Sequence, residues 1–207
     1  SAIELFARDT GTGELTFVAS YVDGVAELDG FGGAAGLAIS PDGLHLYATG
    51  ATDDALAVFA RDTATGVLTA VEVQRESDEG VDGLDGATAV AVSADGQNVY
   101  VASLDDDALA VFSRDAETGA LTYVMRLKDG FGELDLGTID DPVAVAVTPD
   151  GAQVLVAGAL SDTVAIFSRD AATGAVALLQ VLRDGIDGVD GLDLVQTVIV
   201  SAGGRYV

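Results

Sequence analysis

The 207-residue sequence has no cysteine and no tryptophan, three prolines and a single histidine, His45. The absence of cysteine excludes disulfides, thiolate metal ligands and cysteine nucleophiles. With one histidine, multi-histidine metal sites lack ligands, and a Ser-His-Asp triad would depend on this residue alone. His45 lies inside the apolar stretch Leu44–Tyr47, so we interpret it as a half-buried strand residue rather than a general base.

Positive charge is also scarce, because nine Lys and Arg residues face 34 Asp and Glu residues, giving a formal net charge of -25. Such a surface repels phosphate backbones and anionic lipids, so we expect neither nucleic acid binding nor membrane insertion. No apolar run approaches the ~18 residues of a membrane helix. The chain starts at Ser1 without an initiator methionine, as expected after cleavage of a signal peptide or when residues from a cloning vector remain. We therefore expect a secreted or cell-surface protein.

What the sequence does contain is a repeat of roughly fifty residues. A Phe-(Ala/Ser)-Arg-Asp motif, followed each time by a Thr-Gly pair, begins at Phe6, Phe59, Phe112 and Phe167. A second motif of the type Ser/Thr-x-Asp-Gly begins at Ser40, Ser93 and Thr148, and a degraded copy begins at Ser201. A fixed period of this length is typical of propellers and solenoids.

Each repeat reads as four short strands separated by Gly-containing turns. In the repeat that starts near Thr88, the expected strands span residues 88–93, 98–103, 108–114 and 121–127. The apolar runs are short and rich in β-branched residues, which favours strands over helices. Residues 108–114 are apolar on both faces, as expected for a sheet stacked between two others. The pattern predicts an all-β protein, a β-propeller of four-stranded antiparallel blades.

We expect residues 1–207 to form a single propeller domain, or a propeller fragment, with four blade equivalents. The terminal strand pairs are complementary halves of a blade, and leaving them unpaired would expose two sheet edges. We therefore expect closure with a second copy, or membership of a longer propeller chain, rather than a four-bladed ring. The predicted units are the last two strands of a blade at 1–20, whole blades at 34–74, 87–127 and 142–182, and the first two strands of another at 196–207.

The segments LAISPDGLHLYATG and VAVSADGQNVYVAS resemble the repeat of lactonase-type seven-bladed propellers, which include the propeller form of 6-phosphogluconolactonase and YVTN-repeat surface proteins. The resemblance implies a propeller fold and leaves lactone hydrolysis, quinoprotein-like scaffolding and surface-layer roles open. A lactonase is expected to place His, Arg and Glu around the channel mouth, whereas the innermost strands here are mostly Ala, Val, Leu, Ile and Thr.

From these features we predict a non-catalytic binding, scaffold or assembly module; the alternative is a lactonase-like hydrolase of a sugar lactone. The expected partners are a second copy of the chain, another protein or a glycan.

In a propeller, the links between blades and the links between second and third strands emerge on one face. Most acidic residues of this chain lie in those links and would gather there. The long links carry Asp23, Glu27 and Asp29; Asp78, Glu79, Asp82 and Asp85; Asp129, Glu133, Asp135, Asp140 and Asp141; and Asp184, Asp187, Asp190 and Asp193.

Two of these links contain Asp-Gly-apolar triplets, at residues 82–86 and 184–193. Calcium prefers carboxylate and carbonyl oxygens, and such links offer both. They lack the spacing of an EF-hand, and a solvated acidic turn is the alternative interpretation. The candidate calcium ligands are Asp82, Asp85, Asp184, Asp187, Asp190 and Asp193.

Four arginines occupy one repeat position, which indicates an architectural role more than anion binding. We expect each to pair with a carboxylate, either the Asp that follows it or one on a neighbouring blade. Three further arginines precede the acidic links and are expected to offset their charge. The first set is Arg8, Arg61, Arg114 and Arg169, and the second is Arg75, Arg126 and Arg183.

Overall fold

The computed structural model describes residues 1–25, 28–78, 80–132 and 134–207. The described residues form strands, turns and loops, and none of them belongs to a helix long and apolar enough to cross a membrane. Three residues that we expected on the acidic face, Glu27, Glu79 and Glu133, lie outside the described part of the chain. The all-β prediction is confirmed.

The strands form one two-stranded sheet and three four-stranded sheets, each antiparallel and each ordered as in the sequence. The two-stranded sheet contains β1 (Ala2–Arg8) and β2 (Leu15–Val22). We call the four-stranded sheets blades. They contain β3 (Ala34–Ile39), β4 (His45–Gly50), β5 (Ala55–Arg61) and β6 (Leu68–Arg75); β7 (Ala87–Val92), β8 (Asn98–Ser103), β9 (Ala108–Arg114) and β10 (Leu121–Lys128); and β11 (Pro142–Val147), β12 (Gln153–Gly158), β13 (Thr163–Arg169) and β14 (Val176–Arg183).

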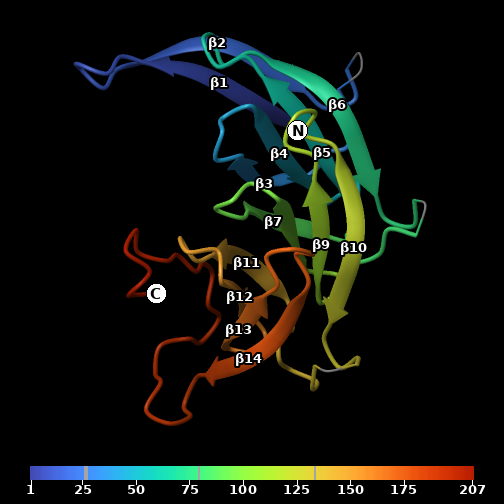
Figure 1. Ribbon diagram of the computed structural model, residues 1–207, viewed down its shortest axis with the longest axis vertical. Helices are drawn as coiled ribbons and strands as arrows, with labels where there is room; N and C mark the ends of the chain where they lie inside the picture. The colour runs from blue at the N-terminus through green and yellow to red at the C-terminus, as the bar shows by residue number, and fades with distance from the viewer. Residues whose placement is uncertain (26–27, 79, 133) are drawn as a thin grey trace.

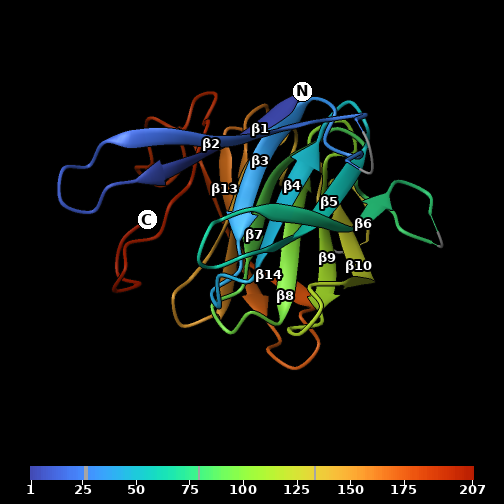
Figure 2. The same cartoon turned by 90° about the horizontal axis from the view of Figure 1, so that it is seen from above.

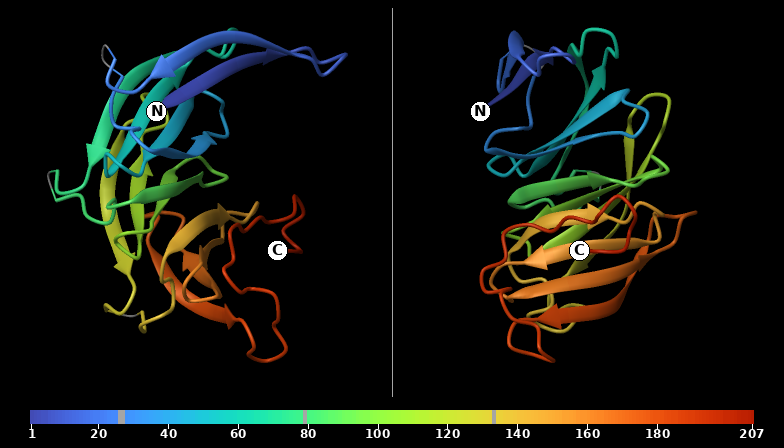
Figure 3. Two further views of the ribbon diagram at one scale, coloured as in Figure 1. Left: turned by 180° about the vertical axis from the view of Figure 1, so that it is seen from behind. Right: turned by 90° about the vertical axis from the view of Figure 1, so that its left-hand side faces the viewer.

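The sheets follow one another along an arc, with the β1–β2 hairpin at one end and the C-terminal segment at the other (Figure 1). Seen from above, the β1–β2 hairpin lies across the blades (Figure 2). The first strands of the blades lie along the inner side of the arc, where β7 contacts both β3 and β11. The fourth strands β6, β10 and β14 lie at the outer side (Figure 3). This is the arrangement of neighbouring propeller blades, in which the first strand lines the central channel.

Successive blades bury apolar side chains between them. Tyr47 and Val58 from the first blade pack with Val99 and Phe112 from the second, and all four side chains are buried. Because strands β5, β9 and β13 are covered on both faces, they carry apolar residues at successive positions. The register between the third and fourth strands shifts just before the repeated Phe, as at Val58/Phe59, which places a β-bulge at the same point of each sheet.

Residues 184–207 contain no strand, which corrects the expectation of a strand pair at 196–207. The segment still packs where the first strand of a further blade would lie, since Val198 is buried in a cluster with Ala144 and Leu155. The turn that begins at Ser201 is also formed, with a backbone bond of 2.9 Å from the Ser201 N–H to the Tyr206 carbonyl. Only Arg205–Val207 follow this turn, which leaves too short a partner to establish a strand ladder.

Candidate functional site

The acidic residue that follows each fourth strand anchors its own link. The Asp23 carboxylate accepts the Phe31 N–H at 3.1 Å, and the Glu76 carboxylate accepts the Leu84 N–H at 2.7 Å. The same position in the next two links is Asp129, which accepts the N–H groups of Gly137, Thr138 and Ile139, and Asp184, which accepts those of Gly191 and Leu192. These carboxylates therefore satisfy backbone donors inside the links, which restricts their freedom to bind other groups.

A second repeated carboxylate connects each blade to the next. It precedes the third strand at Asp54, Asp107 and Asp162, with φ angles of 50°, 49° and 53°. Asp is one of the few residues that tolerate this left-handed conformation. In each case Oδ1 accepts an N–H from the following link, at Gly86, Asp141 and Leu194. At the N-terminus the Ser1 hydroxyl takes this role toward Gly33.

The predicted calcium ligands are distributed over three separate places. Asp82 lies with Glu76 and Asp106, in a group whose carboxylate oxygens are within 4.8 Å of one another. Asp85 lies beside Asp54 on the neighbouring blade. Asp184 is the anchor of its own link, and among the residues described Asp187, Asp190 and Asp193 join no group of metal-binding size.

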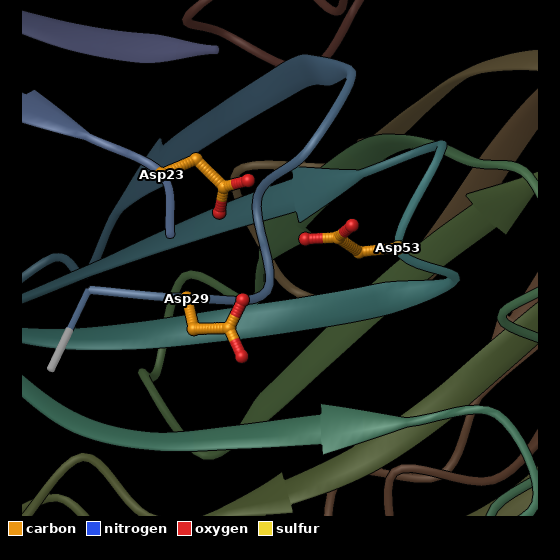
Figure 4. A group of neighbouring side chains, drawn as sticks. All are labelled: Asp23, Asp29 and Asp53. Atoms are coloured by element: carbon orange, nitrogen blue, oxygen red, sulfur yellow. The ribbon is translucent and has the colours of Figure 1, made fainter. Parts of the chain in front are cut away.

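Two further acidic groups were not singled out in the sequence. Asp23, Asp29 and Asp53 converge at one blade junction (Figure 4), and Asp107, Asp140 and Asp141 converge at another. Cationic side chains neutralise part of the charge in the group of Asp23 and in the group of Asp82. Arg75 pairs with Asp29 at 2.6 Å, Arg126 with Asp82 at 2.8 Å and Lys128 with Asp106 at 2.8 Å. The expected charge-offsetting role is confirmed for Arg75 and Arg126. Arg183 instead donates to the carbonyl groups of Ser161 and Gly137. Calcium binding stays a prediction.

Carboxyl pairs lie where the links enter the innermost strands. Asp85 precedes β7, and the carboxylate of Asp54 on the preceding blade acts on it. Asp140 precedes β11 and lies in one group with Asp107, with carboxylate oxygens within 4.8 Å of one another. Partial burial is the main cause that raises the pKa of both Asp85 and Asp140, and the negative charge of the paired carboxylate raises it further. Burial and a neighbouring negative charge both favour the protonated form of Asp85 and Asp140.

These pairs form the candidate site, because they combine titratable groups with a position at one end of the channel-lining strands. A carboxyl group with a raised pKa is a stronger base than an ordinary one when ionised, and it keeps its proton to a higher pH. The charge of Asp105 acts on both Asp85 and Asp141, so the two pairs belong to one continuous acidic patch. Sequence reasoning identified Asp85 but missed its pairing, because the partner comes from a different blade.

His45 lies outside this patch and is buried, with 3% of its surface exposed. Its Nδ1 lies 2.7 Å from Nη2 of Arg114, so it accepts a hydrogen bond there and stays neutral. Burial, followed by the charge of Arg114, lowers the pKa of His45. Arg114 also binds the Tyr47 hydroxyl and the Asp42 carboxylate of the preceding blade. His45 therefore belongs to a contact between blades, in agreement with its interpretation as a structural residue.

The fold and these junctions define a β-propeller of the lactonase type, and comparison with known families agrees. The model of the family described as "Lactonase, 7-bladed beta-propeller" matches residues 1–80 and 73–183. The chain belongs to this family. Among curated proteins, none matches the chain significantly.

Solved structures give the same result for the fold. A Lactobacillus plantarum protein matches with a TM-score of 0.70 and 26% identity, covering 87% of this chain and 48% of its own. A periplasmic gluconolactonase of Pseudomonas aeruginosa matches with a TM-score of 0.62 and 30% identity, covering 77% and 42%. A candidate 6-phosphogluconolactonase of Bacteroides uniformis matches with a TM-score of 0.69 and 20% identity, covering 88% and 48%. The chain thus spans about half the length of these structures.

Proposed function

We propose that this protein works as a lactonase-type hydrolase of a sugar lactone. The observation that carries the proposal is the presence of two carboxyl pairs, Asp54 with Asp85 and Asp107 with Asp140, at the ends of channel-lining strands in a lactonase-family fold. Family membership and the gluconolactonase neighbour support this reading better than the non-catalytic module that the apolar inner strands suggested. Secretion, calcium binding and the protein, glycan or self partners stay predictions.

The chemistry required is ring opening by water. One carboxylate of a pair takes a proton from a water molecule while the oxygen of that water forms a bond to the lactone carbonyl carbon. The bond between that carbon and the ring oxygen then breaks, and the ring oxygen takes a proton from the neutral carboxyl. The product is an open-chain hydroxy acid. Raised pKa values keep one carboxyl of a pair protonated closer to neutral pH than an ordinary aspartic acid, which this proton exchange needs.

The test is hydrolysis of glucono-δ-lactone, followed in a pH-stat at several pH values. We expect turnover above the spontaneous rate, and a loss of at least tenfold in the double variant D85N/D140N, because acid–base groups contribute about 10²–10⁴-fold. D9N is the matched control, since Asp9 lies in an exposed turn between β1 and β2 and accepts only local hydrogen bonds. A double variant as active as D9N, or no enzymatic rate, would reject the proposal.

A further inference from the structure

Arg114 and Arg169 hold adjacent blades together in the same way. Arg114 donates from Nε to the Tyr47 hydroxyl at 2.7 Å and from Nη2 to the Asp42 carboxylate at 2.8 Å. Its Nη1 donates to the carbonyl of Gly96 in its own blade at 2.9 Å. We call this set of contacts the inter-blade clamp. Its partners on the preceding blade are a carboxylate in the turn after the first strand and a phenol on the second strand.

The next junction repeats the inter-blade clamp. Arg169 donates from Nε to the Tyr100 hydroxyl at 2.9 Å, from Nη2 to Asp95 at 2.8 Å and from Nη1 to the Gly151 carbonyl at 3.0 Å. The Arg114 and Arg169 side chains are almost wholly buried, at 0% and 1% exposure. Two copies with the same atoms show that the clamp is a property of the repeat and not of one junction.

Arg61 occupies the equivalent position in the first blade, but it makes one of the three contacts of the inter-blade clamp. Its Nη1 donates to the Gly43 carbonyl of its own blade at 2.9 Å, as the other two arginines do within theirs. In the described part of the chain this is the one hydrogen bond of the Arg61 side chain, and the residue remains partly exposed. The β1–β2 hairpin packs against this blade. Glu4 on β1 lies in the same groove as Arg61, but its carboxylate accepts a hydrogen bond from the Ser20 hydroxyl at 2.7 Å, and neither a carboxylate nor a tyrosine of the hairpin bonds to Arg61.

An apolar groove of about 190 Å³ lies beside Arg61 and includes Leu5, Leu37 and Ile39. Leu37 and Ile39 on β3 are 55% and 54% exposed, whereas Val90, the counterpart of Leu37 on the next blade, is 9% exposed. Among the described strands, β1 pairs with β2 alone, so one edge of β1 is free. In the complete blades the second strand occupies that edge, as β4 does beside β5.

We infer that a β-hairpin with the same key side chains as β3–β4 binds in this groove. Its second strand pairs with the free edge of β1. The hairpin carries a carboxylate in its turn and a tyrosine on its second strand, and both engage Arg61. Strand addition supplies backbone hydrogen bonds, and the clamp supplies selectivity, because Arg recognises carboxylates with a fixed geometry. The apolar side chains of the hairpin cover Leu37 and Ile39.

A second copy of the chain offers, among its described residues, no strand pair or turn that has both a carboxylate and a tyrosine available for Arg61. The β11–β12 turn carries Asp150, but the position matching Tyr47 and Tyr100 is Leu155. The turn at 201–204 has Gly203 where the carboxylate is required. The Asp and Tyr of β3–β4 and β7–β8 are already bound by Arg114 and Arg169. The occupant is therefore a hairpin with its own carboxylate and phenol, rather than an end of another copy.

The probe is a labelled peptide that copies residues 34–51, with binding to the full chain measured by fluorescence anisotropy. We expect saturable binding, and at least tenfold weaker binding when the protein carries R61Q or when the peptide carries D42N or Y47F. R75Q is the matched control, because Arg75 carries the same charge but pairs with Asp29 in a link away from the groove. We expect R75Q to bind the peptide as the unmodified protein does.

Melting curves of R61Q and R75Q show whether both variants are folded, and the peptide variants test the clamp without any change to the protein. Equal binding to R61Q and R75Q, or equal binding of the D42N, Y47F and unmodified peptides, would overturn the inference. The absence of peptide binding would overturn it as well. Light scattering adds a further outcome: a dimer that excludes the peptide would assign the groove to a second copy and reject the hairpin.

Discussion

Tyr47 joins two blades through a hydroxyl that donates to the Gly119 carbonyl at 3.0 Å and accepts from Nε of Arg114 at 2.7 Å. Burial raises its pKa to about 12, so the phenol stays neutral over the working pH range. We expect Tyr47→Phe to destabilise the fold by about 1–3 kcal/mol, because a buried charged donor loses its acceptor. Urea unfolding measures this, with Tyr206→Phe as the exposed control; equal midpoints would contradict the role of the hydroxyl.

Asp42 gives the clamp a dependence on pH. Partial burial raises its pKa, but hydrogen bonds from Ser40, the Leu44 N–H and Arg114 outweigh burial and lower the pKa to about 2 from 3.8. Because the folded pKa is the lower one, this group contributes stability above pH 3.8 that is lost as the pH falls toward 2.

We expect Asp42→Asn to lower the melting temperature at pH 6 and to have a smaller effect at pH 2.5, where the wild-type carboxylate is already largely protonated in the unfolded chain. Scanning calorimetry across this range measures the difference. The control is Asp150→Asn, at the same turn position, whose carboxylate accepts from Thr148 and Ala152 but from no arginine among the described residues. A loss that is the same at both pH values would contradict the assignment.

At the scale of single residues, the sequence predicted which residue types form ion pairs better than it predicted which particular residues contact one another. All four repeated arginines were expected to pair with carboxylates. Arg114 and Arg169 do so with Asp42 and Asp95 on neighbouring blades, whereas Arg8 and Arg61 form no ion pair with the described residues. The tyrosine hydroxyls and His45 could not be placed in the same contact, because they are 67 to 69 residues away along the chain. The clamp residues do recur with the repeat, as Tyr47 and Tyr100 show, but the sequence alone does not indicate which of the recurring residues touch across two blades.

At the scale of elements, the strands were the most predictable part. The third strand expected at 108–114 is β9 itself, and the second expected at 98–103 is β8. The links were less predictable. A run of Asp-Gly triplets suggested a calcium loop, yet the first carboxylate of such a run, Asp184, folds back onto the Gly191 and Leu192 N–H groups. Composition does not distinguish a carboxylate that serves its own backbone from one that faces a cation.

The Asp162 connection between blade and link offers a test at this scale. Its Oδ1 accepts the Leu194 N–H at 2.8 Å, and its φ of 53° is unfavourable for most residues. Asn retains the acceptor and tolerates the conformation, whereas Ala does neither. We expect Asp162→Ala to be about 1–3 kcal/mol less stable than Asp162→Asn, from backbone strain and a lost hydrogen bond.

Chemical denaturation compares the two variants, and hydrogen exchange reports the consequence for the link. We expect the Leu194 amide to lose protection in Asp162→Ala and to keep it in Asp162→Asn. If both variants are equally stable with equal exchange, the side chain does not hold the link.

At the scale of the whole molecule, a lactonase-family blade stack must carry a formal net charge of -25 without losing its packing. Carboxylates on the link face serve as backbone acceptors, as partners of Arg75, Arg126 and Lys128, and as carboxyl pairs with raised pKa values. The remaining repulsion acts between exposed charges. It is therefore sensitive to ionic strength, because the Debye length falls from about 10 Å at 0.1 M salt to about 3 Å at 1 M.

We expect the melting temperature to rise with sodium chloride between 0.05 and 1 M and then to level off. The same series with calcium chloride at matched ionic strength tests the predicted calcium ligands, because an ion bound at a hundred times its dissociation constant adds ~2.7 kcal/mol to the free energy of unfolding. An additional rise that EDTA reverses and that D82N reduces would support calcium binding. Coincident sodium and calcium curves would contradict it and leave screening as the whole effect, and a melting temperature unchanged by sodium chloride would contradict the repulsion argument itself.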